Sequence, residues 1–229
     1  MMLPGYCGID LTHKICDGIP VWPGDNGFQL KISDSNFSFV DMPQGCGTHI
    51  DAPRHFYEDG MDIASISLES LTGNVCILDI TKQCDADVDY LATKQDILNW
   101  EKDHDSIPAD SLFFVYTGWS KYWPNANKYL NFDSTETMHF PGISLDAAEY
   151  LSLKGVKGIG IDTMSVDGGC SKDFPVHQFT LSRGCFHVEN LKDIHLLPVK
   201  GAFVMAMPIR IKEAGEAPAR VIGFYKKEE

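Results

Sequence analysis

The stretch SLDAAEYLSLKGVKGIGID at positions 144–162 decides the fold class of this chain. Ser144 can cap a helix whose apolar residues recur at three- and four-residue spacing, and Gly155 can end that helix. The short apolar run at 158–161 follows almost at once and is typical of a strand. A helix that leads directly into a strand is an αβ unit, so the stretch predicts a sheet with helices packed on it, not a sandwich.

Further elements of the same kind lie on both sides of this unit. Thr93 and Asp96 have the spacing of a capping box in front of apolar residues, which predicts a second helix. Five more apolar runs, most of them bounded by Gly, Pro, Asp or Asn, predict strands at 28–32, 75–80, 112–116, 202–207 and 221–225. We therefore expect an α/β fold with a mixed sheet. No repeat, low-complexity tract or charged linker divides the chain, so we expect one domain over residues 1–229.

Composition excludes several classes of protein. The 229 residues are 44% hydrophobic and 22% charged, close to the averages for globular proteins, which argues against disordered and fibrous chains. No apolar run approaches the roughly 20 residues that a membrane-spanning helix needs. Residues 1–5 lack the basic flank and apolar stretch of a signal peptide. We expect a cytoplasmic protein without a membrane partner.

Charge and cysteine content narrow the choice further. The net charge of -13 would repel the phosphates of nucleic acid, so we expect no nucleic-acid partner. The 7 cysteines include no C-x-x-C pair, which argues against a disulfide framework and against a thiolate zinc site.

The chemically informative stretch is GCGTHIDAPRH at positions 45–55. Pro53 and Gly47 disfavour a helix here, and in an extended chain residues two apart share a face. His49 and Asp51 would then present an imidazole and a carboxylate to the same side, which is a metal-ligand geometry. His55 follows the proline and can fold back toward the pair.

A second group of possible ligands lies farther along the chain, at Asp173, His177 and Glu189. Together the two stretches offer imidazole nitrogens and carboxylate oxygens, which suit zinc, manganese or ferrous iron. A His-x-Asp pair taken alone also forms ordinary structural hydrogen bonds, so the pattern by itself leaves both interpretations open.

The stretch at 47–55 resembles the G-T-H-x-D-x-P-x-H signature of the cyclase family of metal-dependent hydrolases. This family includes bacterial kynurenine formamidase, isatin hydrolase and trans-dienelactone hydrolase. The resemblance extends along nearly the whole chain, through WPGD at 22–25, YTGW at 116–119, HFPG at 139–142, GIGIDT at 158–163 and FPVH at 174–177.

The resemblance implies a swivelling β/β/α fold, a homodimer or larger assembly, and bound zinc or manganese. It implies hydrolysis of a C–N bond in an amide or a C–O bond in a lactone by metal-activated water. It also implies that His49 and Asp51 hold one ion, that Asp51 can bridge to a second ion held by His177 and Glu189, and that His55 is the catalytic acid and base.

One position departs from the family pattern. The family signature begins with a further histidine, where this chain has Gly45. Either a ligand of the first ion is missing, which predicts one tightly held ion per chain and a second site that is empty or weak, or another residue replaces it. The candidates for that replacement are Gln44, Cys46, Asp25 and His13. Alternatively, the glycine serves a tight turn at 44–47.

Aromatic and histidine residues near proline and glycine are candidates for the substrate pocket. We predict that Trp22, Trp119 and His139 bind substrate, although core packing explains such aromatics equally well. The remaining histidines have no spacing that favours metal binding, and we expect structural roles for them; they are His13, His104, His187 and His195.

The leading functional hypothesis is hydrolysis of a small aryl formamide such as N-formylkynurenine. A lactone or an isatin-like lactam is the alternative substrate for the same site. Two further hypotheses are a thiolate mechanism at Cys46 and a non-catalytic relative that keeps a ligand pocket. Against the last, a cluster of carboxylates and imidazoles is costly to bury without an ion.

Overall fold

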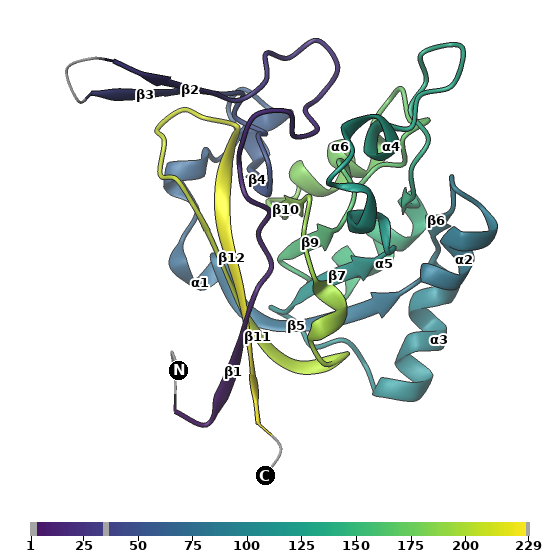
Figure 1. Ribbon diagram of the computed structural model, residues 1–229. Helices are drawn as coiled ribbons and strands as arrows, with labels where there is room; N and C mark the ends of the chain where they lie inside the picture. Colours follow the sequence, from purple (N-terminus) through teal and green to yellow (C-terminus); the bar gives the residue numbers. More distant parts are fainter. Residues whose placement is uncertain (1–3, 34–36, 228–229) are drawn as a thin grey trace.

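A closed sheet forms the centre of the protein (Figure 1). The structure is a computed structural model and describes residues 4–33 and 37–227. Strand β12 (Glu216–Lys226) pairs with both β11 (Lys200–Pro208) and β4 (His49–Asp51), so seven strands close in the order β12-β11-β5-β7-β9-β10-β4. Strand β1 (Tyr6–Asp10) continues the sheet along the other end of β12. The sequence prediction of a mixed α/β fold is confirmed.

The middle of the sheet is parallel. Strands β5 (Thr72–Asp79), β7 (Leu112–Tyr116), β9 (Gly158–Ile161) and β10 (Phe186–Glu189) run parallel to one another. The other pairs of the closed sheet, β10–β4, β4–β12, β12–β11 and β11–β5, are antiparallel. The predicted strands at 112–116 and 158–161 have the bounds that the sequence indicated.

Apolar side chains cover both faces of the parallel strands. Phe114 packs inside the closed sheet with Ile50 and Val188, whereas its neighbour Phe113 packs outside against the helices. Helix α3 (Lys94–His104) contributes Trp100 to this outer layer. Because successive strand residues point to opposite faces, a strand buried on both sides reads as a continuous apolar run.

Both predicted helices are present. Helix α3 begins at the predicted capping box of Thr93 and Asp96. Helix α5 (Leu145–Leu153) follows Ser144, whose hydroxyl bonds to the carbonyl of Ala92 and not to the helix backbone. Gly155 lies just beyond this helix with a φ of 75°, the left-handed conformation that glycine adopts at least cost.

The remaining elements lie around this body. The predicted strand at 28–32 forms β2 (Gln29–Ile32), which pairs with β3 (Ser38–Asp41) in a separate two-stranded hairpin that projects from the molecule (Figure 1). The other short elements are α1 (Leu68–Leu71), α2 (Thr81–Ala86), β6 (Leu91–Ala92), α4 (Ala126–Leu130), β8 (Gly142–Ile143), α6 (Pro175–Leu181) and four 3₁₀ turns at Pro53–His55, Ile63–Ser65, Trp119–Tyr122 and Ile194–Leu196.

Within 4–33 and 37–227, no helix combines the length and the apolar character that crossing a membrane requires. The sequence-based expectation about the start of the chain concerns residues 1–5, of which 1–3 lie outside the described residues.

The close packing of β9 gives a test of this arrangement. A Cβ atom added at Gly158 would lie 2.5 Å from Phe186 Cζ and 2.8 Å from Leu112 Cδ2, and both of these side chains are buried. We expect Gly158→Ala to lower the free energy of unfolding by about 1–3 kcal/mol, the usual cost of overpacking. Urea denaturation of the two proteins measures this difference in the free energy of unfolding. Gly27→Ala, at an exposed glycine with no atom within 4 Å, is the control and should have the stability of the unmodified protein.

Candidate metal centre

The register of three neighbouring strands gathers the chemically active side chains. Strand β4 lies between β10 and β12, with His187 and Glu216 opposite Asp51 on its two sides. Glu189 lies opposite His49 in the next row. Side chains opposite one another in a sheet share a face, and so do residues two apart along a strand. Five polar side chains therefore project from the same face.

This face is the outer one. Ile50, between His49 and Asp51, packs inside the closed sheet with Val188 and Ala217 from the neighbouring strands. The sequence prediction that His49 and Asp51 lie on an extended segment with Ile50 in the core is confirmed.

Helix α6 (Pro175–Leu181) brings His177 over the strands. Asp167 fixes the start of this helix, because its carboxylate accepts hydrogen bonds from the backbone N–H groups of Val176 (3.0 Å) and His177 (3.1 Å). The same carboxylate accepts a bond of 2.7 Å from His177 Nδ1. Asp167 thus leaves Nε2 of His177 facing the strands.

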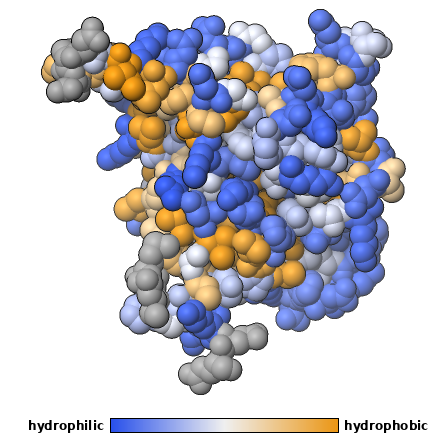
Figure 2. All heavy atoms as spheres, viewed as in Figure 1, coloured by the Kyte–Doolittle hydropathy of each residue, from blue (hydrophilic) through white to orange (hydrophobic). Residues whose placement is uncertain are grey.

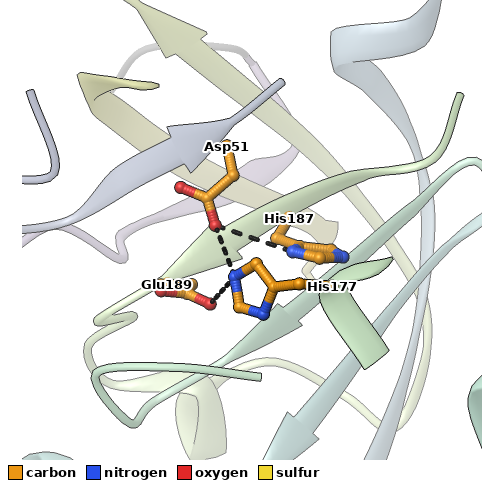
Figure 3. A group of neighbouring side chains, drawn as sticks. All are labelled: Asp51, His177, His187 and Glu189. Atoms are coloured by element: carbon orange, nitrogen blue, oxygen red, sulfur yellow. Dashed lines mark ion pairs between the residues drawn. The ribbon is translucent and has the colours of Figure 1, made fainter. Parts of the chain in front are cut away.

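Asp51 faces three imidazoles, and Figure 3 shows its pairs with His177 and His187. Its oxygens lie 3.3 Å from His49 Nε2, 3.3 Å from His177 Nε2 and 3.6 Å from His187 Nδ1. The residue is 1% exposed, and neither carboxylate oxygen makes a hydrogen bond. A buried carboxylate without hydrogen bonds is costly unless a cation compensates it.

The orientation of the imidazoles supports the same conclusion. His49 Nδ1 lies 2.9 Å from the carbonyl oxygen of Gly47 and must donate to it, because a carbonyl only accepts. In a neutral ring the lone pair of Nε2 then faces Asp51 Oδ1 and Glu189 Oε2, the latter at 3.5 Å. Acceptors that face acceptors require a cation or a proton between them.

Two overlapping sets of donors result. One comprises Asp51, His177, His187 and Glu189, and the other His49, Asp51 and Glu216; within each set the donor atoms lie within 4.8 Å of one another. Nitrogen and oxygen donors of this kind suit zinc or manganese, so the residues present fit such an ion.

The electrostatics show an excess of negative charge. Burial alone lowers the pKa of an imidazole, but the hydrogen bond to Asp167 and the carboxylates of Asp51 and Glu189 raise the pKa of His177 to about 10. Burial and the charge of Asp51 raise the pKa of Glu216 to about 7. Positive charge is therefore favoured at this centre, whether a bound proton or a metal ion supplies it.

A cavity of about 370 Å³ opens over the centre. His55 borders it, with Nδ1 3.4 Å from Glu216 Oε2 and a side chain that is 30% exposed. The rings of Trp22, Phe56 and Phe174 form an aromatic wall, with ring centroids 5.9 Å apart for Trp22 and Phe174 and 6.1 Å apart for Phe56 and Phe174. Phe174 has a φ of 47°, which is uncommon for a residue other than glycine, directly before Pro175 begins α6.

The structure brings most of the predicted site residues together, but not all of them. His49, Asp51, His55, His177, Glu189 and Trp22 lie at the centre or border the cavity. Trp119 is buried elsewhere, and its indole N–H donates to the carbonyl of Tyr129. His139 pairs with Asp89 at 2.7 Å in a separate group. Asp173 is exposed.

Cys46 does not have the surroundings of a reactive thiol. Its side chain is fully buried in an apolar cluster, and burial raises its pKa. A reactive cysteine is partly exposed and has a lowered pKa, so the geometry opposes the thiolate hypothesis.

Three residues of the centre were not found from the sequence. From the sequence we expected a structural role for His187, yet it lies beside Asp51. Its His-x-Glu spacing with Glu189 repeats the His-x-Asp spacing of β4 and is the signal that could have revealed it. Glu216 and Asp167 carry no local signal, because strand pairing and the start of α6 place them.

Comparison with known proteins gives consistent matches. The family model described as Putative cyclase matches residues 9–168. Isatin hydrolase of Roseibium aggregatum is 33% identical, over 83% of this chain and 75% of its own length. Kynurenine formamidase of Erythrobacter litoralis is 29% identical, over 93% of this chain and 91% of its own length.

Solved structures agree with these sequence matches. A crystal structure of an isatin hydrolase bound to the product analogue thioisatinate superposes with a TM-score of 0.92 at 28% identity, covering 97% of this chain and 94% of that one. A potential metal-dependent hydrolase with cyclase activity superposes with a TM-score of 0.77 at 27% identity, covering 97% of this chain and all of that one (100%). With its motif, its closed sheet and its clustered His, Asp and Glu side chains, the chain belongs to the cyclase family of metal-dependent hydrolases.

Proposed function

We propose that this protein hydrolyses the C–N bond of a small aryl amide, with a formamide such as N-formylkynurenine as the leading substrate. The observation that carries the proposal is the carboxylate of Asp51, which is buried without a hydrogen bond between two imidazole nitrogens. We assign the binding of zinc, or alternatively manganese, to His49, Asp51, His177 and Glu189.

A divalent cation held by these residues would lower the pKa of water and polarise a carbonyl group. The protein supplies the rest of the site. Asp167 orients His177, and the carbonyl of Gly47 orients His49, so both rings keep the same nitrogen toward the carboxylates.

We assign the acid and base role to His55. Its ring borders the cavity and is partly exposed, so it can reach both a substrate and solvent. Glu216 Oε2 lies near its Nδ1 and can hold the ring in position. Such a residue takes a proton from water and passes it to the leaving nitrogen.

The cavity supports a flat aromatic substrate. Its volume of about 370 Å³ is at the small end of the range for ligand sites, and Trp22, Phe56 and Phe174 offer ring faces and edges. The alternative substrate is an isatin-like lactam or a lactone. The similarity to proteins named isatin hydrolase supports the lactam. A non-catalytic pocket protein is the remaining alternative.

We further propose that the protein forms a homodimer in the cytoplasm and adopts the swivelling β/β/α type of fold. The projecting β2–β3 hairpin supports self-association, because Leu30, Ile32, Phe39 and Val40 are exposed there. Figure 2 shows apolar side chains gathered at this hairpin, at the upper left of the view.

The net charge of -13 and the small cavity favour a small-molecule substrate as the partner.

Metal removal tests the proposed function directly. The metal-loaded protein is tested on N-formylkynurenine, isatin and a dienelactone. Protein stripped with a strong chelator should no longer hydrolyse the compound that the loaded protein hydrolyses, and zinc or manganese should restore this activity. Hydrolysis rates for the three compounds, measured alongside metal content, also identify the bond type. Undiminished turnover after verified metal removal would contradict the proposal, and turnover of none by metal-loaded protein would favour the non-catalytic alternative.

Two substitutions separate metal binding from proton transfer. Asp51→Ala should abolish both metal binding and turnover, because this carboxylate joins both sets of donors. His55→Ala should keep the metal and lose roughly 10²-fold or more in rate, as expected for an acid and base. Elemental analysis and steady-state kinetics distinguish them. Full metal content in the Asp51 variant would overturn the site, and metal loss in the His55 variant would make His55 a ligand.

The role of Asp167 can be measured without substrate. Asp167→Asn removes the charge that orients His177 and should weaken metal affinity by about 10- to 100-fold, the usual effect of losing a partner of a ligand. Calorimetric titration of metal into stripped protein measures this. Asp173→Asn, at an exposed carboxylate near the same helix, should leave the affinity unchanged.

A further inference from the structure

The space beside Gly45 is filled by the carboxylate of Glu216. A Cβ atom added at Gly45 would lie 2.5 Å from Glu216 Oε1 and 3.3 Å from His49 Nε2. The side chain that the family signature places at position 45 would therefore enter the same volume that the Glu216 carboxylate occupies.

Glu216 has the contacts of a metal ligand on the side of the centre where His49 lies. Its Oε1 lies 3.7 Å from His49 Nε2, and the two residues form one set of donors with Asp51. Both oxygens of Asp51 lack a hydrogen bond, which points independently to a cation at this position.

The backbone holds Glu216 in this place. Strand pairing sets it opposite Asp51, and the side-chain oxygen of Gln44 accepts hydrogen bonds from the N–H groups of Gly215 (3.1 Å) and Glu216 (3.2 Å). The residue next to Gly45 thus ties the two segments together.

Gln44 and Gly45 do lie in a turn, but this turn does not place Gly45 in the left-handed conformation that favours glycine. Gly47 has a φ of 72°, whereas Gly45 is not among the residues with positive φ. Gly45 is required by the close approach of Glu216 and not by its own conformation.

We propose that Glu216 is the ligand that replaces the histidine missing at position 45, so that His49, Asp51 and Glu216 hold one ion and Asp51, His177 and Glu189 hold a second. This inference rests on the proposed metal-dependent function. The expectation of a single ion, drawn from the absence of a ligand at Gly45, then no longer follows.

The replacement has a chemical consequence. A carboxylate in place of an imidazole gives this ion one nitrogen and more oxygen donors, and adds negative charge. Oxygen-rich sites suit manganese better than imidazole-rich sites do, so the Glu216 position should favour Mn²⁺ relative to its histidine counterpart.

The test compares four proteins by calorimetric titration of stripped protein with Mn²⁺ and with Zn²⁺, and by elemental analysis after dialysis. They are the unmodified protein, Glu216→Ala, the double variant Gly45→His with Glu216→Ala, and the control Glu213→Ala, whose exposed side chain lies three residues earlier. Gly45→His alone is unsuitable because Glu216 blocks its side chain.

We expect two ions per chain in the unmodified protein and in the control. Glu216→Ala should bind one of them at least about 100-fold more weakly, since losing even a partner of a ligand costs about 10- to 100-fold. The double variant should regain two ions, with its preference shifted from Mn²⁺ toward Zn²⁺.

The contrary results are distinct. If the unmodified protein binds metal and Glu216→Ala binds it with the same stoichiometry and affinity, Glu216 is not a ligand, and its contact with His55 becomes its main role. That outcome leaves the proposed function standing. If the unmodified protein binds neither metal, the proposed function fails together with this inference.

Discussion

The carboxylate of Asp51 is the constraint on which the rest of the centre depends. It is buried on the outer face of a closed sheet, and no hydrogen bond from the protein reaches either oxygen. Removing a charged carboxylate from water without a partner costs about several kcal/mol or more, and only a positive charge next to the carboxylate offsets that cost. His49, His177 and His187 all turn a ring nitrogen toward Asp51, yet none makes a hydrogen bond with it. The arrangement is therefore more stable with a cation bound among these side chains than without one.

The division of the sheet into two faces makes this possible. The inner face of β4, β10 and β12 carries Ile50, Val188 and Ala217, which complete an apolar core. The outer face of the same three strands carries the carboxylates and imidazoles, and α6 covers it with His177. Strand alternation thus places each ligand of these strands next to a fully buried apolar residue, which keeps those ligands rigid. An isatin hydrolase structure superposes with a TM-score of 0.92 at 28% identity, as expected where different apolar residues can fill a core of the same pattern.

Gly45 and Glu216 illustrate how a site of this kind can change without losing its geometry. They are 171 positions apart in the chain, yet the absence of a side chain at one leaves the volume that the carboxylate of the other fills. The contact between Gln44 and the backbone of Glu216 keeps the two segments in register. On the proposal above, Glu216 supplies from a distant segment the donor that the family signature places at position 45, and it brings a negative charge with it. Such an exchange would alter metal preference before it altered the fold.

Much of this protein follows from local sequence. The apolar runs at 112–116 and 158–161 form strands with those bounds, the capping box at Thr93 begins a helix, and the alternation at 49–51 gives both the strand and the shared face of His49 and Asp51. These features depend on neighbours a few residues away, so the sequence suffices. The positions of Glu216, His187 and Asp167 depend instead on strand register and on the packing of α6, which join segments far apart in the chain. Trp119 and His139 show the converse: their local surroundings resembled those of site residues, but packing placed one in an apolar cluster and the other beside Asp89. Only the tertiary structure decides which distant residues meet, because the closure of the sheet sets those distances.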